Sequence, residues 1–189
     1  QLTEQMPEYF DEFERMLFHL PLIGSAFKKI YYDANLERPV AEFVPIDQFY
    51  VSYYASDLRK ADRYTHIIYK NPIDMQHDID AGIYSDIELP EASNPTPTAF
   101  ASKMDTILGL SPTADSDPQY VLLEQHVHLD LPDSETEEGE YAPYIITVEQ
   151  DSRQILSVRR NYKPNDPKKE KRIHFVHYRF VPGFGFYGL

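Results

Sequence analysis

The first regular pattern of apolar residues in the chain spans residues 4–20. Its apolar side chains recur at spacings of three and four, which places them on one face of a helix with a 3.6-residue period. These residues are Met6, Tyr9, Phe10, Phe13, Met16, Leu17 and Leu20. Pro21 and Gly24 follow and favour the end of the helix. We predict an amphipathic helix that packs on the next sheet, with a helix lying in a subunit groove as the alternative.

The rest of the chain alternates between runs rich in Val, Ile, Phe and Tyr and short polar connections. Such runs fit a pleated, half-buried surface. We expect strands at 25–32, 39–44, 49–54 and 63–69, and short helices at 73–81 and 100–110. Four further strands are expected at 120–130, 144–150, 154–161 and 172–181. The short connections between strands, such as residues 151–153, favour an antiparallel meander.

These elements predict an α+β fold, with an N-terminal amphipathic helix and a mixed, mostly antiparallel β-sheet with short helices. A chain of 189 residues suits one domain. We expect a single region with a helix plus a β-rich half at 1–88, a loop and short helix at 89–118, and an antiparallel β meander at 119–189. The first residue is Gln1 and the last segment is apolar, from which we expect a region truncated at both ends.

Composition narrows the function classes. The net charge is −13, which opposes non-specific binding to nucleic-acid phosphates and to anionic lipid. The chain has no cysteine, so it has neither disulfides nor thiolate chemistry. No apolar run approaches the roughly 20 residues of a membrane span. The 15 Tyr and 11 Phe suit half-buried sheets and subunit interfaces.

Two connections carry strong local charge. Residues 131–142 are rich in acids, and we expect a solvated loop there, because the spacing of an EF-hand calcium loop is absent. The acids are Asp133, Glu135, Glu137, Glu138 and Glu140. Residues 159–172 hold seven basic residues against two acidic ones, a local charge of +5. Three interpretations are open for this second stretch: a solvated hairpin loop, a nucleic-acid patch, or a contact with an acidic patch on a neighbouring copy.

Histidines are the remaining candidates for chemistry. His126 and His128 lie two apart on a predicted strand and so share a face, but a structural zinc site needs about four ligands. We expect ordinary hydrogen bonds for both. The alternative is a metal-dependent hydrolase that combines them with carboxylates of the 131–142 loop. Neither a Gly-rich phosphate loop nor a GxSxG nucleophile turn occurs. We therefore predict no enzyme, no cofactor, and no catalytic, cofactor-binding or metal-binding residues.

Five segments, in this order along the chain, resemble the portal proteins of tailed bacteriophages, most closely those of short-tailed phages and related prophages. They are LPLIGSAFKKIYYD (20–33), RPVAEFVPIDQFYV (38–51), DLRKADRYTH (57–66), ITVEQDSRQILSVRRNY (146–162) and FVHYRFVPGFGFYGL (175–189). The resemblance covers nearly all of the chain, but no single segment is a catalytic motif. It implies the wing region of a portal subunit, without stem, clip or crown.

That family has a well-defined role, which the resemblance implies here as an expectation. Portal subunits form a ring, usually of twelve, at one vertex of the capsid, and serve DNA packaging, DNA ejection and head–tail joining. Implied partners are further copies of the chain, terminase, capsid or scaffold proteins and tail adaptors, with DNA passing through the channel without tight binding. The implied location is the virion, and the bacterial host cytoplasm during assembly, with no membrane partner.

The alternative function is a nucleic-acid-binding module that uses residues 159–172. A ligand cleft with converging histidines and acids would contradict the interpretation of the chain as a purely structural region.

Overall fold

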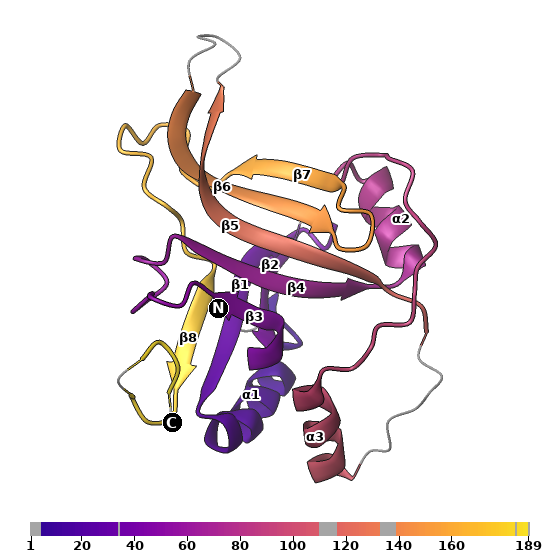
Figure 1. The fold of residues 1–189 in the computed structure, drawn as a ribbon, viewed down its shortest axis with the longest axis vertical. Helices are drawn as coiled ribbons and strands as arrows, with labels where there is room; N and C mark the ends of the chain where they lie inside the picture. The colour runs from indigo at the N-terminus through magenta and orange to yellow at the C-terminus, as the bar shows by residue number, and fades with distance from the viewer. Residues whose placement is uncertain (1–4, 34, 110–116, 133–138, 184, 189) are drawn as a thin grey trace.

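The computed structural model describes residues 5–33, 35–109, 117–132, 139–183 and 185–188, and it has an α+β fold (Figure 1). The helices are α1 (Tyr9–Ile23), α2 (Pro72–Asp80) and α3 (Ala99–Leu108), with a 3₁₀ turn η2 (Ile46–Gln48). The strands are β1 (Ser25–Asp33), β2 (Arg38–Val44), β3 (Phe49–Val51), β4 (Arg63–Lys70), β5 (Tyr120–Pro132), β6 (Gly139–Glu149), β7 (Ile155–Arg160) and β8 (Phe175–Arg179). The predicted fold class is therefore confirmed.

The strands form two antiparallel sheets. The small sheet has the order β2-β1-β8 and the large sheet the order β3-β4-β5-β6-β7. The expected meander holds for β5, β6 and β7, but it is wrong for the fourth strand, because β8 leaves the large sheet and pairs with β1. Each sheet thus combines strands from the first and last thirds of the chain.

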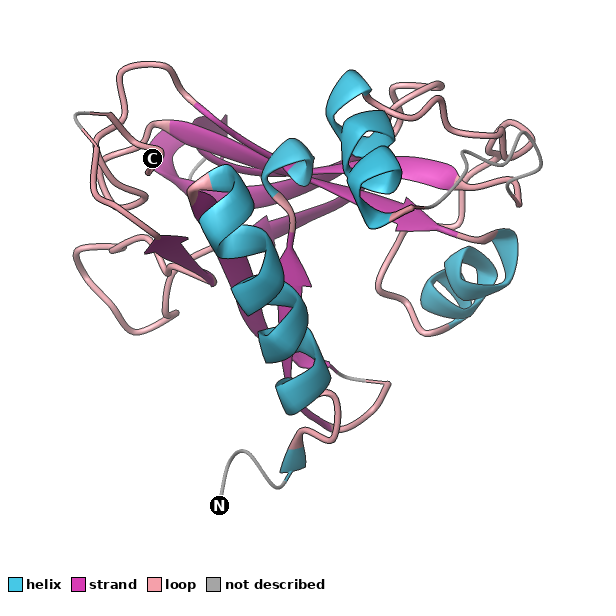
Figure 2. Cartoon of the chain, turned by 90° about the horizontal axis from the view of Figure 1, so that it is seen from below, coloured by secondary structure: helices cyan, strands magenta, loops and turns pink. Residues whose placement is uncertain are grey.

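Helix α1 packs on the small sheet (Figure 2). Met16 is fully buried, and Phe13 and Leu20 pack beside it against Ala26 of β1 and Phe43 of β2. This is the packing that the apolar pattern predicts. The helix ends at Gly24, whose φ of 82° is left-handed and costs glycine little.

The apolar face of α1 is wider than the surface it covers. Phe10 and Leu17, which the periodicity placed on the packed face, are exposed. The helix rests on a sheet of only three strands, and side chains on the flank of its apolar face therefore have nothing to pack against.

The first five residues of β1, Ser25–Lys29, are buried on both faces, because α1 covers one side and the large sheet covers the other. Ala26 and Lys28 point to α1, where the Lys28 ammonium lies 4.1 Å from the ring centre of Tyr9. Phe27 and Lys29 alternate with them and point to the large sheet. β1 therefore joins the three layers.

The main core lies between the two sheets. It consists of Phe27, Val44, Phe49, Leu58, Ala61, Tyr64, Phe175 and Phe186. The Phe27 ring stacks on Phe49 at 4.1 Å between centroids. Phe186 stacks on His177, so the last described segment is packed by its aromatic residues.

A second core lies on the large sheet, where Met75 of α2 and Tyr84, which follows the helix, pack against Leu122 and Leu156. Asn71 caps α2, because its side-chain oxygen accepts the N–H of Asp74 at 2.8 Å. The turn after β1 reaches α2, because Nδ2 of Asn35 donates to Asp78 at 3.2 Å. In the residues that the structure describes, no helix is long and apolar enough to cross a bilayer.

Candidate functional site: the inter-sheet cleft

A cleft of about 760 Å³ lies between the two sheets and α2, and we call it the inter-sheet cleft. It is lined by β1 and β2 of the small sheet, by β4, β5 and β7 of the large sheet, by α2, and by the residues before β8. The aromatic core that joins the sheets gives way here to charged and polar side chains.

A buried ion pair crosses the cleft floor from sheet to sheet. The Lys29 ammonium of β1 donates to the Glu124 carboxylate of β5 at 2.9 Å, and both side chains are about one-tenth exposed. The other oxygen of Glu124 accepts from Nε2 of His126 at 3.1 Å. Glu124 and His126 lie two apart on β5, so both face the cleft.

The polar contacts continue from β5 to the residues around β7 and β8. Nδ2 of Asn161 lies 3.4 Å from Nδ1 of His126, and its Oδ1 lies 3.1 Å from Nε2 of His174. Because Glu124 accepts a hydrogen bond from the Nε2–H of His126, Nδ1 of the neutral His126 ring carries no proton and accepts from the Asn161 amide. We call these five residues the polar network: Lys29, Glu124, His126, Asn161 and His174.

Burial and charge set the protonation of the polar network. Burial alone would raise the pKa of Glu124, but the Lys29 charge and the His126 hydrogen bond outweigh it and hold that pKa well below its usual value. Burial lowers the pKa of His126 and lowers that of His174 to about 4, in the latter case with help from His126 and Arg172. At neutral pH the floor therefore holds an ammonium, a carboxylate and two neutral imidazoles.

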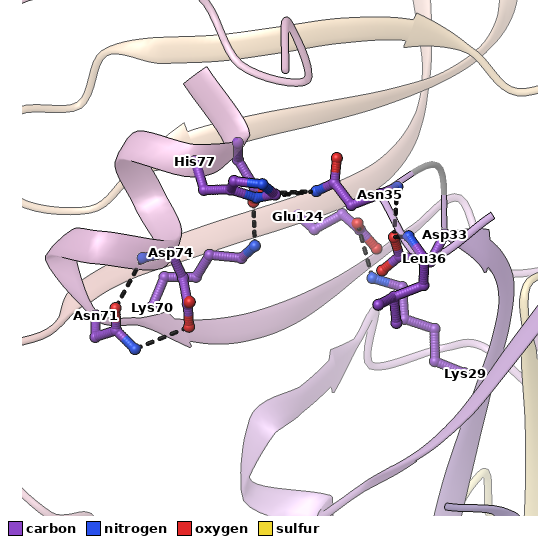
Figure 3. Close-up of polar contacts among 10 residues, drawn as sticks. Lys29, Asp33, Asn35, Leu36, Lys70, Asn71, Asp74, His77 and Glu124 are labelled. Atoms are coloured by element: carbon purple, nitrogen blue, oxygen red, sulfur yellow. Dashed lines mark hydrogen bonds and ion pairs between the residues drawn. The ribbon is translucent and has the colours of Figure 1, made fainter. Parts of the chain in front are cut away.

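The α2 side of the cleft carries a second set of polar contacts, shown in Figure 3 with the Lys29–Glu124 pair. Lys70 forms an ion pair with Asp78, which also accepts from Nδ2 of Asn35 at 3.2 Å. Asp33 accepts the backbone N–H of Asn35 at 2.8 Å and so shapes the turn after β1. The charges on this side are thus used in holding α2 and the β1–β2 turn.

Four charged residues of the cleft have no such partner. Glu42, Arg159, Arg160 and Arg172 form no ion pair within the described residues. Burial raises the pKa of Glu42, although Lys29 opposes the shift. The three arginines are exposed at the β7–β8 side of the cleft, and we call them the arginine cluster.

The structure separates the two histidines of the proposed metal site. His126 belongs to the polar network, whereas His128 stacks on Tyr141 with 5.4 Å between ring centres. Among the described residues there is no group of three His, Cys, Asp or Glu side chains that could hold a metal ion. Most carboxylates of the acidic stretch, residues 133–138, lie outside the described part of the chain.

The basic stretch 159–172 is folded on itself. Its acid Asp166 accepts the backbone N–H groups of Lys168 and Glu170, each at 3.0 Å. Lys171 donates to the backbone oxygen of Ala61 at 2.7 Å, which fastens the stretch to the connection before β4. The solvated-loop interpretation therefore fits its middle, while its two ends enter the inter-sheet cleft.

The sequence analysis missed Lys29, Glu124 and Asn161. A usable signal was present, because Lys29 shares a strand face with the apolar Phe27, and Glu124 shares one with the apolar Leu122, so each places a charge, of opposite sign, on a buried face. His174 falls within the strand expected at 172–181, but it precedes β8, and its Nε2 lies 3.1 Å from Oδ1 of Asn161.

The inter-sheet cleft does bring histidines and acids together, which is the feature that opposes a purely structural interpretation. On its floor, however, these groups bond to one another, so Glu124 and His126 are engaged in holding the sheets. The groups left to meet a ligand are the arginine cluster and Glu42. The arrangement is therefore suited to binding an anion.

No model of a known protein family matches the chain, and no curated protein matches it significantly.

Proposed function

We propose that this chain is a structural region of a phage portal ring, where it associates with copies of itself at the capsid vertex. In that role it serves DNA packaging, DNA ejection and head–tail joining. The ordered resemblance of five sequence segments supports the family, and the exposed apolar side of α1 supports the self-association.

That exposed side carries the proposal structurally. Phe10 is 70% exposed, and Leu17, Phe18 and Leu22 are each about half exposed. A spacing of seven relates Phe10 to Leu17, and a spacing of four relates Phe18 to Leu22, so the two pairs lie on adjoining flanks of α1 outside the face that packs on the small sheet. Exposed apolar side chains that gather on one element mark protein interfaces. The α1 side chains that fail to pack within the subunit are the ones we assign to contact with the next copy.

A second exposed group lies in the connection between β3 and β4. Tyr53 and Tyr54 are 91% and 94% exposed, and their rings meet edge to face at 5.1 Å. Tyrosine is enriched in the centres of interfaces, because it offers a large ring and a polar tip. We assign this pair to the same class of subunit contact.

The test uses the full-length protein, native mass spectrometry and electron microscopy. The wild type should form rings of identical subunits, and the Phe18→Glu, Leu22→Glu double variant should remain largely monomeric. The matched control is Ile73→Glu on α2, a residue that is 81% exposed but lies on another element. It should assemble as the wild type does. A wild type that stays monomeric under assembly conditions overturns the proposal.

The second candidate is a nucleic-acid-binding module that uses residues 159–172. Arg159, Arg160 and Arg172 favour it, because they are exposed and have no acidic partner within the described residues. Binding to DNA should then weaken steeply as salt is raised. Absence of DNA affinity at low salt excludes this candidate.

A further inference from the structure

We propose that the inter-sheet cleft binds a small phosphate-bearing ligand, whose phosphate is held by Arg159 and Arg172. This site is separate from the proposed ring contacts on α1, so its existence does not depend on the portal role.

The backbone places Arg159 and Arg172 at one end of the cleft. Arg159 pairs with Ile145, which pairs with His126, so Arg159 lies on the cleft face of the large sheet, whereas its neighbour Arg160 lies on the other face. Arg159 and Arg160 are the last residues of β7, and the N–H of Asn161 continues the pairing by donating to the oxygen of Pro143 at 2.9 Å. The N–H of Arg172 donates to the Asn161 oxygen at 2.9 Å, and Nδ2 of Asn161 donates to the Arg172 oxygen at 3.0 Å. Asn161 is 1% exposed, so a buried side chain ties the two ends of the basic stretch together.

The other cations of the cleft form ion pairs, whereas the positive charge of the arginine cluster remains without an acidic partner in the described residues. Lys29 is neutralised by Glu124 and Lys70 by Asp78, whereas no arginine of the cluster has an acidic partner in the described residues. Arg159 and Arg172 place two like charges at one end of the cleft, and a bound anion offsets their mutual repulsion. Guanidinium groups match phosphate oxygens through paired hydrogen bonds, which favours phosphate as the anion.

The cleft has the size of a small-molecule site. Its volume of about 760 Å³ lies within the range of roughly 300–1,000 Å³ typical of such sites. A DNA duplex is about 20 Å across, and we expect it to remain outside a space of this size.

The opposite end of the cleft indicates what else the ligand carries. Sheet order puts the arginine cluster at the β7–β8 side and Glu42 at the far edge of the small sheet, on β2. Glu42 and the hydroxyl of Tyr31 line the cleft and can accept hydrogen bonds from a ligand. The chemical class is therefore a phosphate monoester with a donor-rich body, as in a sugar phosphate or a nucleoside monophosphate.

Isothermal titration calorimetry tests this with adenosine 5′-monophosphate, adenosine and inorganic phosphate as probes, at constant ionic strength in sodium chloride. The monophosphate should bind the wild type, and adenosine should bind it much more weakly. The Arg159→Gln, Arg172→Gln double variant should weaken the monophosphate at least about tenfold, because it removes charge-assisted hydrogen bonds. The control is Arg59→Gln, Arg63→Gln, which removes the same charge from exposed positions outside the cleft. It should bind as the wild type does.

Two results overturn the proposal. One is equal weakening in the cleft variant and the control, which means that binding follows net charge alone. The other is no binding of monophosphate or inorganic phosphate to the wild type at millimolar concentration. A short DNA duplex is titrated in parallel. If the duplex binds more tightly than the monophosphate and only the cleft variant loses it, the cluster serves nucleic acid, and the small-ligand proposal is wrong. Unchanged thermal unfolding of both variants establishes that the losses come from binding.

Discussion

The interface between the two sheets is aromatic and apolar at one end and charged and polar at the other. At one end Phe27 of β1 lies in an aromatic core with Phe49, Tyr64 and Phe175. Two residues further along the same strand, and on the same face, Lys29 enters the polar network of the inter-sheet cleft. One strand therefore supplies both the apolar anchor and the buried charge.

The comparison separates stability from specificity. Burying aromatic surface is favourable without regard to direction, so the apolar end contributes most of the free energy that holds the sheets together. Burying an ion pair costs hydration free energy, and the attraction between the two charges offsets this cost only when the geometry is good. The polar end therefore contributes little net stability. It requires a particular partner at a particular place, however, and it leaves the cleft open beside it.

The largest expected effect comes from breaking the apolar end. Phe27→Ala removes a fully buried ring that stacks on Phe49 at 4.1 Å and on His177 at 4.6 Å. We expect the free energy of unfolding to fall by about 4 kcal/mol, because the neighbouring side chains cannot refill the cavity. Urea denaturation followed by circular dichroism measures the change.

The control is Phe180→Ala, directly after β8, which removes an identical ring that is 57% exposed. It should change stability by less than about 0.5 kcal/mol. Equal losses at the two positions would show that the inter-sheet core has been misassigned.

The next effect comes from breaking the polar end. Glu124→Leu leaves the Lys29 ammonium buried without its carboxylate, and we expect a loss of about 3 kcal/mol in the free energy of unfolding. The double variant Lys29→Met, Glu124→Leu removes both charges and should recover most of that loss. Such a recovery would show that each charge is needed mainly because its partner is buried beside it.

An exposed pair provides the reference. Arg15 bonds to Glu12 at 3.0 Å with its side chain 67% exposed, so Arg15→Met should cost less than about 1 kcal/mol. If Glu124→Leu costs no more than this, the cleft floor is hydrated and the pair is equivalent to a surface one.

The smallest effect concerns pH at the boundary between the two ends, where His66 is 3% exposed and packs edge-on against Phe175. Burial, helped by the Lys29 charge, lowers the pKa of His66 from 6.5 to about 3. Between these values the unfolded chain binds a proton that the folded chain does not. Stability is therefore full above pH 6.5 and falls as the pH drops, by about 2 kcal/mol from pH 7 to pH 5 for this residue.

Urea titrations of the wild type and His66→Gln at pH 7 and pH 5 measure this contribution. The variant should lose less stability than the wild type over that interval. Identical dependence in the two proteins would mean that His66 is hydrated in the folded state.

Local patterns predicted most elements closely. The strand expected at 25–32 is β1 at Ser25–Asp33, and the helix expected at 73–81 is α2 at Pro72–Asp80. β3 stops at Val51, short of the predicted residue 54, because a turn closes where the N–H of Ala55 meets the oxygen of Ser52. Apolar residues alone do not reveal such a turn.

The candidate site was far less predictable. His126 was noticed, but its paired acceptor Glu124, the partner Lys29 and the link Asn161 were not. Lys29 and Glu124 are 95 residues apart in sequence, and nothing in either strand specifies the other. The arginine cluster appeared in the sequence as a basic stretch, and only the folded chain separates its ends, in the cleft, from its self-bonded middle.

By itself, the sequence determined the kind and order of the elements, because the helix and strand periods can be recognised from residues that are close together in the sequence. Tertiary structure decided that β8 joins β1 and leaves the meander, and that a lysine from one sheet meets a glutamate from the other. These choices depend on which surfaces bury one another when the whole chain closes up. Segments distant in sequence compete for the same partner, and a local sequence pattern does not predict which of them pairs with it.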